Sequence, residues 1–287
     1  MTVADCHVHL HETDDPGKTS ERLLEAMDSN NVSKVCLFAP PPYPDDELSL
    51  QDSQPNPEAQ RESTDLVAEV ASADPDRIVP FAWISPLLDE SIGEVERGVR
   101  EHGIEGVKMD PNHWYPYDEE IFPLYEKVEE LRLPIIFHSG INFAFVDASR
   151  FSRPAYFEPL IRFPDLKFAL AHVSWPWVVE CLATAGHFKF AEEECGREKM
   201  QMYVDITPGT PPSYRAEALD KAVKYLGDNF LLFGSDASTE NLEHMRRVIR
   251  RDKIVYEQLG WSRERKNKVF EENLRKFLKH EEGSNEV

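Results

Sequence analysis

Short β-rich runs alternate with amphipathic helical patterns along this chain, and the alternation constrains its fold more than any other feature. Eight runs are predicted as strands, at residues 2–9, 34–39, 77–83, 106–110, 134–138, 167–172, 200–206 and 230–235. Strands separated by helices pair in parallel, because each crossover helix returns the chain to the end of the sheet where the previous strand began. Eight such units predict a single (β/α)8 TIM barrel over residues 1–287 of the 287-residue chain, with a C-terminal helix.

The helical patterns fall between these runs, at residues 20–27, 58–72, 92–102, 119–131, 177–194, 215–226, 240–259 and 263–278. No Gly-x-Gly-x-x-Gly follows the first strand, which argues against an open dinucleotide-binding sheet.

Two connections between predicted elements are long. Residues 40–57 are proline-rich and are predicted to form a lid on the active-site face, and residues 139–156 are predicted as a surface loop or a substrate contact on the same face.

Composition narrows the range of partners. The chain has 53 acidic residues against 32 Lys and Arg, a formal net charge of −21, so nucleic acids and anionic membranes are not expected to bind. Its 4 cysteines form no Cys-x-x-Cys pair, which argues against a disulfide framework and favours a reducing cytosol. No apolar run approaches the roughly 18 residues of a membrane span. We therefore expect a cytoplasmic protein with a small-molecule substrate, and a homo-oligomer is compatible with the sequence.

His7 and His9 form a His-x-His pair on the first predicted strand. Side chains alternate along a strand, so the two imidazoles are expected on one face about 7 Å apart, where they can share a metal ion. Asp5 is expected on that face too. The alternative is a half-buried strand with two incidental histidines.

Polar residues also end the other predicted strands. They are Lys108 and Asp110 at the end of the fourth strand, His138 at the end of the fifth, His172 at the end of the sixth, Asp205 near the end of the seventh and Asp236 after the eighth. In a barrel of parallel strands, all these carboxyl ends meet at one open mouth. The sequence therefore predicts that these side chains gather in one site.

These residue types suit a catalytic metal centre. Three neutral imidazoles, from His7, His9 and His138, and the Asp236 carboxylate are predicted to bind a divalent ion, with Zn²⁺ expected and Mn²⁺ or Fe²⁺ also compatible. Such a set leaves a coordination position for water, and Asp236 is predicted to accept a proton from that water. His172 is predicted to act as a general acid or to hold a developing oxyanion.

Lys108, Trp114 and Arg150 are the predicted substrate-binding residues. Lys108 has two interpretations: a carboxylated amine that bridges a second metal ion, or an ammonium group that pairs with Asp110 or with an anionic substrate. Trp114 follows the fourth strand and is predicted to wall the pocket. Arg150 lies in the long connection after the fifth strand and is predicted to contact a carboxylate.

Five segments in this order resemble the amidohydrolase superfamily, in its amidohydrolase-related (amidohydrolase 2) branch of metal-dependent hydrolases, lactonases and aromatic-acid decarboxylases. The segments are residues 5–9, 106–111, 136–140, 170–173 and 232–236. The resemblance covers nearly the whole chain and implies that His7, His9, His138 and Asp236 are metal ligands, with His172 as the catalytic histidine. The family commonly carries a histidine where this chain has Asp110.

Three functions follow as hypotheses. The leading one is hydrolysis of a small ester, lactone or amide by a metal-activated water. The second is a metal-dependent lyase activity, the non-oxidative decarboxylation of an aromatic or unsaturated carboxylic acid, which the same ligand set would serve. The third is a barrel without catalysis that acts as a binding protein.

Overall fold

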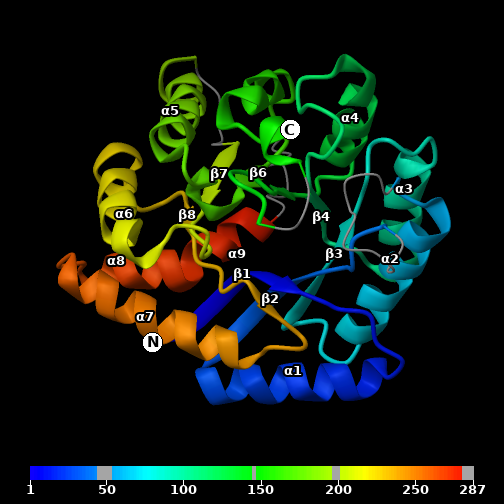
Figure 1. The fold of residues 1–287 in the computed structure, drawn as a ribbon, viewed down its shortest axis with the longest axis horizontal. Coiled ribbons are helices and arrows are strands. Elements are labelled where there is room, and N and C mark those ends of the chain that lie inside the picture. The colour runs from blue at the N-terminus through cyan, green and yellow to red at the C-terminus, as the bar shows by residue number, and fades with distance from the viewer. Residues whose placement is uncertain (44–53, 144–146, 196–200, 280–287) are drawn as a thin grey trace, which may run out of the picture.

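The computed structural model describes residues 1–43, 54–143, 147–195 and 201–279, and these residues form one curled parallel sheet surrounded by helices (Figure 1). The strands are β1 (Val3–His9), β2 (Val32–Phe38), β3 (Ile78–Trp83), β4 (Gly106–Met109), β5 (Ile135–Phe137), β6 (Phe168–Leu170), β7 (Met202–Asp205), β8 (Leu231–Leu232) and β9 (Ala237–Ser238). Their order in the nine-stranded sheet is β8-β7-β6-β5-β4-β3-β2-β1-β9. From β1 to β8, each strand therefore pairs with the next one in sequence, as the alternation predicts.

The last two strands close the barrel. β8 pairs with β7 and β9 pairs with β1, while only four residues separate β8 from β9 in the chain. Between them, the backbone N–H of Cys6 donates to the carbonyl oxygen of Phe233 at 2.9 Å. One chain segment thus joins both edges of the sheet, and the prediction of a (β/α)8 barrel is confirmed.

Helices occupy most of the crossovers between the strands and follow the last strand (Figure 1). They are α1 (Pro16–Asn30), α2 (Pro57–Ala71), α3 (Ser91–His102), α4 (Phe122–Glu130), α5 (Val178–Cys195), α6 (Pro212–Leu226), α7 (Glu243–Gln258), α8 (Arg263–Asn267) and α9 (Asn273–Leu278). Between β5 and β6 the chain forms a 3₁₀ segment, Pro154–Arg162, with a second proline, Pro159, inside it. Because proline cannot donate an α-helical backbone hydrogen bond, Pro159 is compatible with a 3₁₀ segment in place of a regular α-helix here.

The predicted strands coincide with the observed ones within a few residues. The eighth differs, because the predicted run 230–235 is only the first half of a segment that continues as β9. The first residue of the predicted seventh strand, Met200, lies outside the described residues. None of the helices in the described parts of the chain has the length and apolar character needed to cross a membrane.

Among the described residues, two apolar clusters form the core, one between the sheet and the helices and one inside the barrel. The inner cluster includes Cys6, Phe38 and Phe81 from the strands. Leu274 and Phe277 of α9 belong to it too, so the C-terminal helix packs against the barrel interior. Because this filling occupies only part of the barrel, the carboxyl ends of the strands remain available for polar side chains.

A buried ion pair joins α6 to α7. Arg215 is 1% exposed and Asp252 is fully buried, and two guanidinium nitrogens of Arg215 donate to the two carboxylate oxygens of Asp252, with Nε at 2.9 Å from Oδ1. On the same helix, Lys224 and Asp220 form an exposed pair, with a distance of 2.7 Å between Nζ and Oδ2. The two pairs offer a matched comparison of buried and exposed charge.

Replacing Asp252 with Ala is expected to lower the free energy of unfolding by about 3–5 kcal/mol, because it leaves the Arg215 charge buried without its partner. Asp220→Ala is expected to cost less than about 1 kcal/mol. Urea denaturation followed by circular dichroism measures both values. Equal losses in the two variants would contradict the buried pair's structural role.

Candidate active site

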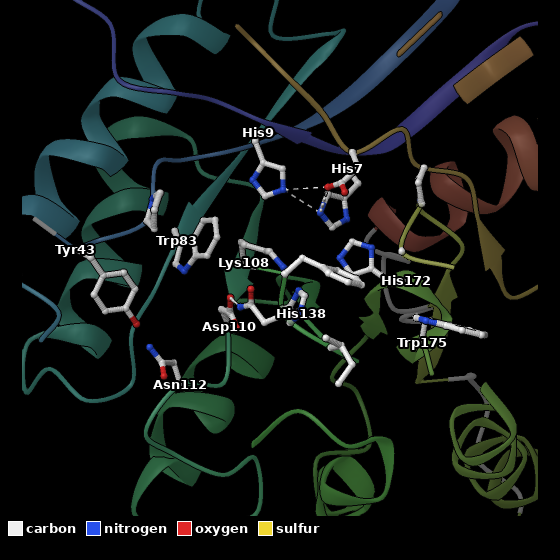
Figure 2. Close-up of a pocket in the computed structure, with 17 residues that line it drawn as sticks. His7, His9, Tyr43, Trp83, Lys108, Asp110, Asn112, His138, His172 and Trp175 are labelled. Carbon is white, nitrogen blue, oxygen red and sulfur yellow. Dashed lines mark hydrogen bonds and ion pairs between the residues drawn. The ribbon is translucent and has the colours of Figure 1, made fainter. Parts of the chain in front are cut away.

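The carboxyl ends of the strands enclose a cavity of about 300 Å³ (Figure 2). Its histidines and charged side chains lie at or just after the ends of different strands, and the connections that follow the strands supply most of the remaining lining. The lining residues are His7, His9, Pro41, Tyr43, Trp83, Lys108, Asp110, Asn112, His138, Ile141, Asn142, Phe143, His172, Trp175, Pro208, Gly209 and Asp236. The structure thus brings Lys108, His138, His172 and Asp236 together with the His7–His9 pair.

His7, His9 and Asp236 form a close group in the cavity, and Figure 2 shows the two histidine rings near each other. The Nε2 atoms of the two histidines lie 3.1 Å apart, and each lies 3.4 Å from Oδ1 of Asp236. Within the described residues, one ligand atom from each of the three lies within 4.8 Å of the others, a spacing that one metal ion can bridge.

A break in the β1–β2 register places the two histidines. The register shifts between Asp5 and Val8, so the simple alternation of side chains fails there. Cys6 belongs to the inner apolar cluster, and the next residue, His7, faces the cavity. The expectation that Asp5 shares their face is wrong, because Asp5 does not line the cavity. Its Oδ1 instead accepts the backbone N–H groups of His7 at 3.1 Å and Ser235 at 2.8 Å, which ties β1 to the segment before β9.

Asp205, at the end of β7, orients His7 from behind the cavity. Its Oδ2 lies 2.6 Å from Nδ1 of His7, and both side chains are buried. Burial acts to raise the pKa of Asp205, but the charge and hydrogen bond of His7 hold it below its ordinary value. An ionised Asp205 therefore places the His7 proton on Nδ1 and leaves Nε2 free to bind a cation, the usual arrangement behind a metal-ligating histidine.

Asp236 reaches the histidines through an unusual backbone conformation. Its φ is +60°, in the left-handed region, and its N–H donates to the carbonyl oxygen of His7 at 3.0 Å. Burial raises the pKa of Asp236, while the His9 hydrogen bond and the His7 charge lower it by more, so the net shift is downward. The carboxylate therefore stays ionised beside the two imidazoles.

His138 and His172 face each other beyond this group, with ring centroids 5.1 Å apart, and the His172 ring lies 5.2 Å from that of His7. Nε2 of His138 and Nδ1 of His172 are buried and have no protein hydrogen-bond partner among the described residues. Burial lowers the pKa of each imidazole to about 3. Both rings are therefore neutral near pH 7, which is the form that ligates metals.

The backbone is strained at His172 and at the two residues that follow it. The residues His172, Val173 and Ser174 have φ values of 63°, 50° and 51°, and this conformation is costly for a β-branched residue such as Val173. The Ser174 hydroxyl lies 2.6 Å from the hydroxyl of Ser139, which follows β5. Packing between the ends of β5 and β6 thus maintains the turn that directs the imidazole into the cavity.

The donor set fits a divalent metal ion. Neutral imidazole nitrogens, an ionised carboxylate and buried ring nitrogens without protein partners are the features expected of such a site. His138 lies outside the group of three close ligand atoms, so its role as a fourth ligand stays a prediction.

The end of β4 supplies a row of polar side chains, since alternate residues of a strand share a face. Lys108, Asp110 and Asn112 all line the cavity. Nδ2 of Asn142 donates to Oδ2 of Asp110 at 3.1 Å, while Oδ1 of Asp110 is buried without a partner in the described structure. Burial raises the pKa of Asp110 to about 6, although the Lys108 charge acts to lower it.

Two of the predicted substrate-binding residues lie elsewhere. Trp114 is 2% exposed and packs in the apolar core, so it does not line the cavity. Arg150 does not line it either, because its guanidinium group is exposed, lies 3.5 Å from Asp147 and stacks on Phe151. Trp83 and Trp175 form aromatic walls instead, and only their positions, at the end of β3 and after β6, could have indicated this from sequence.

The two long connections both reach the cavity. Pro41 and Tyr43 from the first and Ile141, Asn142 and Phe143 from the second are lining residues. The prediction of a lid falls largely on residues 44–53, which lie outside the described residues, as do residues 144–146 of the second connection.

Comparison with known proteins found one family whose model matches nearly the whole chain. The model of the amidohydrolase family matches residues 4–279, and comparison with curated proteins found no match.

Solved structures share the fold at low sequence identity. A 2,6-dihydroxybenzoate decarboxylase from Rhizobium has a TM-score of 0.67 at 15% identity, with 97% of this chain and 98% of that chain covered. A manganese-bound 5-carboxyvanillate decarboxylase from Novosphingobium aromaticivorans has the same TM-score at 15% identity, with 97% of each chain covered. A probable 2-pyrone-4,6-dicarboxylic acid hydrolase from Acinetobacter baumannii has a TM-score of 0.63 at 14% identity, with 97% and 99% covered.

Replacing Asp205 with Asn is expected to weaken metal binding by about 10- to 100-fold, because the amide no longer fixes the proton of His7 on Nδ1. Metal titration of the purified protein measures this. Asp28→Asn, which alters an exposed carboxylate 2.8 Å from Arg77, is the matched control and should bind metal as the unmodified protein does. Unchanged affinity in the Asp205 variant would contradict the proposed orientation of His7.

Proposed function

The chain belongs to the amidohydrolase family, and from this premise we propose that it is a metal-dependent hydrolase of a small ester, lactone or amide. The observation that carries the proposal is the convergence of His7, His9 and Asp236 in a cavity that also contains His138 and His172. The cavity volume of about 300 Å³ suits a single-ring or short-chain substrate.

His7, His9 and Asp236 would hold the metal ion, with His138 as the fourth ligand. Bound there, a divalent ion acts as a Lewis acid and lowers the pKa of water, which supplies a nucleophile near neutral pH. Zn²⁺ suits these nitrogen and oxygen ligands, and so does Mn²⁺, which is bound in the related 5-carboxyvanillate decarboxylase.

The protein's own side chains complete the reaction. Asp236 is ionised, so a carboxylate oxygen accepts the proton that the nucleophile loses. His172 is neutral near pH 7, which favours a hydrogen bond to the developing oxyanion over proton donation by an imidazolium. Asp205 keeps His7 in one tautomer throughout.

The Asp236→Asn variant is expected to hydrolyse substrate about 100- to 10,000-fold more slowly, because it lacks the proton acceptor, while it retains most of its metal. Initial rates on a panel of small esters, lactones and amides, with metal content by mass spectrometry, measure both quantities. Glu240→Gln, a 72% exposed carboxylate following β9, is the control and should behave as the unmodified protein.

Retained turnover in the Asp236 variant would contradict the assignment. A purified protein with no stoichiometric metal, and none taken up on incubation, would instead support a barrel that binds ligands without catalysis.

Decarboxylation of an aromatic or unsaturated acid is the second candidate, and Asp110 is the observation that favours it. Decarboxylation needs a proton donor for the carbon that loses CO2. The pKa of Asp110 is raised to about 6 by burial, so this carboxyl group holds a proton more readily than an exposed aspartate.

If decarboxylation is the reaction, CO2 release from hydroxybenzoates should fall as the pH rises through about 6, because Asp110 loses its proton there. The Asp110→Asn variant should lose this activity, whereas Asp147→Asn, which changes a 66% exposed carboxylate, should keep it. A coupled CO2 assay over pH 5–8 gives the profile. No CO2 release across a broad acid panel would exclude this candidate.

A further inference from the structure

The Lys108 side chain is buried without a protein partner. It is 1% exposed, and its Nζ atom has no hydrogen-bond partner among the described residues. An ammonium group has three N–H donors, and burying it is unfavourable unless it is paired. Such a group in a cavity wall indicates a ligand that supplies the missing hydrogen-bond acceptor and negative charge.

The surroundings of Lys108 compensate its charge only in part. Nζ lies 5.4 Å from the centroid of the Phe38 ring and 5.5 Å from that of Trp83, within the range of cation–π attraction. Burial lowers the pKa of this amine, and the negative charge of Asp110 opposes that shift. Within the described structure, no carboxylate lies within ion-pair distance of Nζ.

Lys108 is also the only lysine or arginine among the described residues that line the cavity. The other candidate cations are engaged outside it: Arg150 lies beside Asp147, and Arg153 pairs with Glu180 at 2.5 Å. Figure 2 shows the Lys108 side chain extending into the space that the histidines and Asp110 surround.

We propose that Lys108 binds a carboxylate group of the substrate. The inference rests on the proposed function and specifies its substrate class: a small, flat molecule that carries a carboxylate in addition to the ester, lactone or amide that is cleaved. The Lys108 ammonium provides the charge, the side-chain amide of Asn112 lies on the same strand end as a further donor, and Trp83 provides a flat wall.

The geometry favours a monoanionic carboxylate over a phosphate ester. A phosphate dianion usually requires several cationic or backbone donors, and only one cationic side chain is available among the lining residues described. The Asp110 carboxyl group on the same strand end would also repel a second negative charge.

Binding of benzoate and of its neutral counterpart benzamide tests the proposal by calorimetry on the metal-loaded protein. Benzoate is expected to bind about 10-fold or more tightly than benzamide, and Lys108→Met should weaken benzoate binding by about 10- to 100-fold while leaving benzamide unchanged. Lys224→Met, the same change at a 74% exposed lysine, is the matched control and should preserve the preference. Circular dichroism verifies that each variant is folded.

Equal binding of the two probes, or an unchanged benzoate preference in Lys108→Met, would overturn the proposal. So would a fall from two metal equivalents to one in that variant, because the lysine would then be a metal ligand in carboxylated form. These results are independent of turnover, so a protein that prefers benzoate through Lys108 but hydrolyses no substrate would refute the proposed function alone.

Discussion

Closure of the barrel by the segment that contains β8 and β9 is the constraint on which the candidate site depends. The segment pairs with β7 on one side and with β1 on the other, and the Asp236 N–H donates to the carbonyl of His7. Gly234 allows this close approach, since a Cβ at that position would lie 2.8 Å from Cβ of His7. Asp236 therefore meets the histidines of β1 although more than two hundred residues separate them in sequence.

The same geometry explains why much of the site could be predicted from sequence. Parallel strands bring their carboxyl ends to one mouth, so a polar residue at the end of a strand is placed by the topology alone. His138, His172 and Asp236 reach the cavity for this reason. Asp205 ends β7 in the same way, but its contact with His7 depends on side-chain depth, which strand periodicity does not fix.

Other features could not be predicted because they depend on departures from regular strands. The register shift in β1 turns Asp5 away from the cavity, although simple alternation would place it beside His7. Trp114 and Trp83 are both aromatic and both lie near strand ends, yet only Trp83 lines the cavity. The chain that follows each strand decides which ring turns inward, and a single sequence does not specify that path.

Burial gives the side chains of this cavity different charge states, and this difference bears on which reaction the site can catalyse. The same desolvation lowers the pKa of His138 and His172 to about 3 and raises that of Asp110 to about 6. Asp236 remains ionised because the histidines of β1 adjoin it, whereas the Asn142 amide is the only partner of Asp110 within hydrogen-bond distance in the described parts of the chain. A proton acceptor and a proton donor can therefore coexist in one small cavity. Both are aspartates, and their different neighbours give them different pKa values. In the proposed functions, hydrolysis would use the Asp236 carboxylate and decarboxylation would use the Asp110 carboxyl group, so the group that the substrate presents to each one would determine the chemistry.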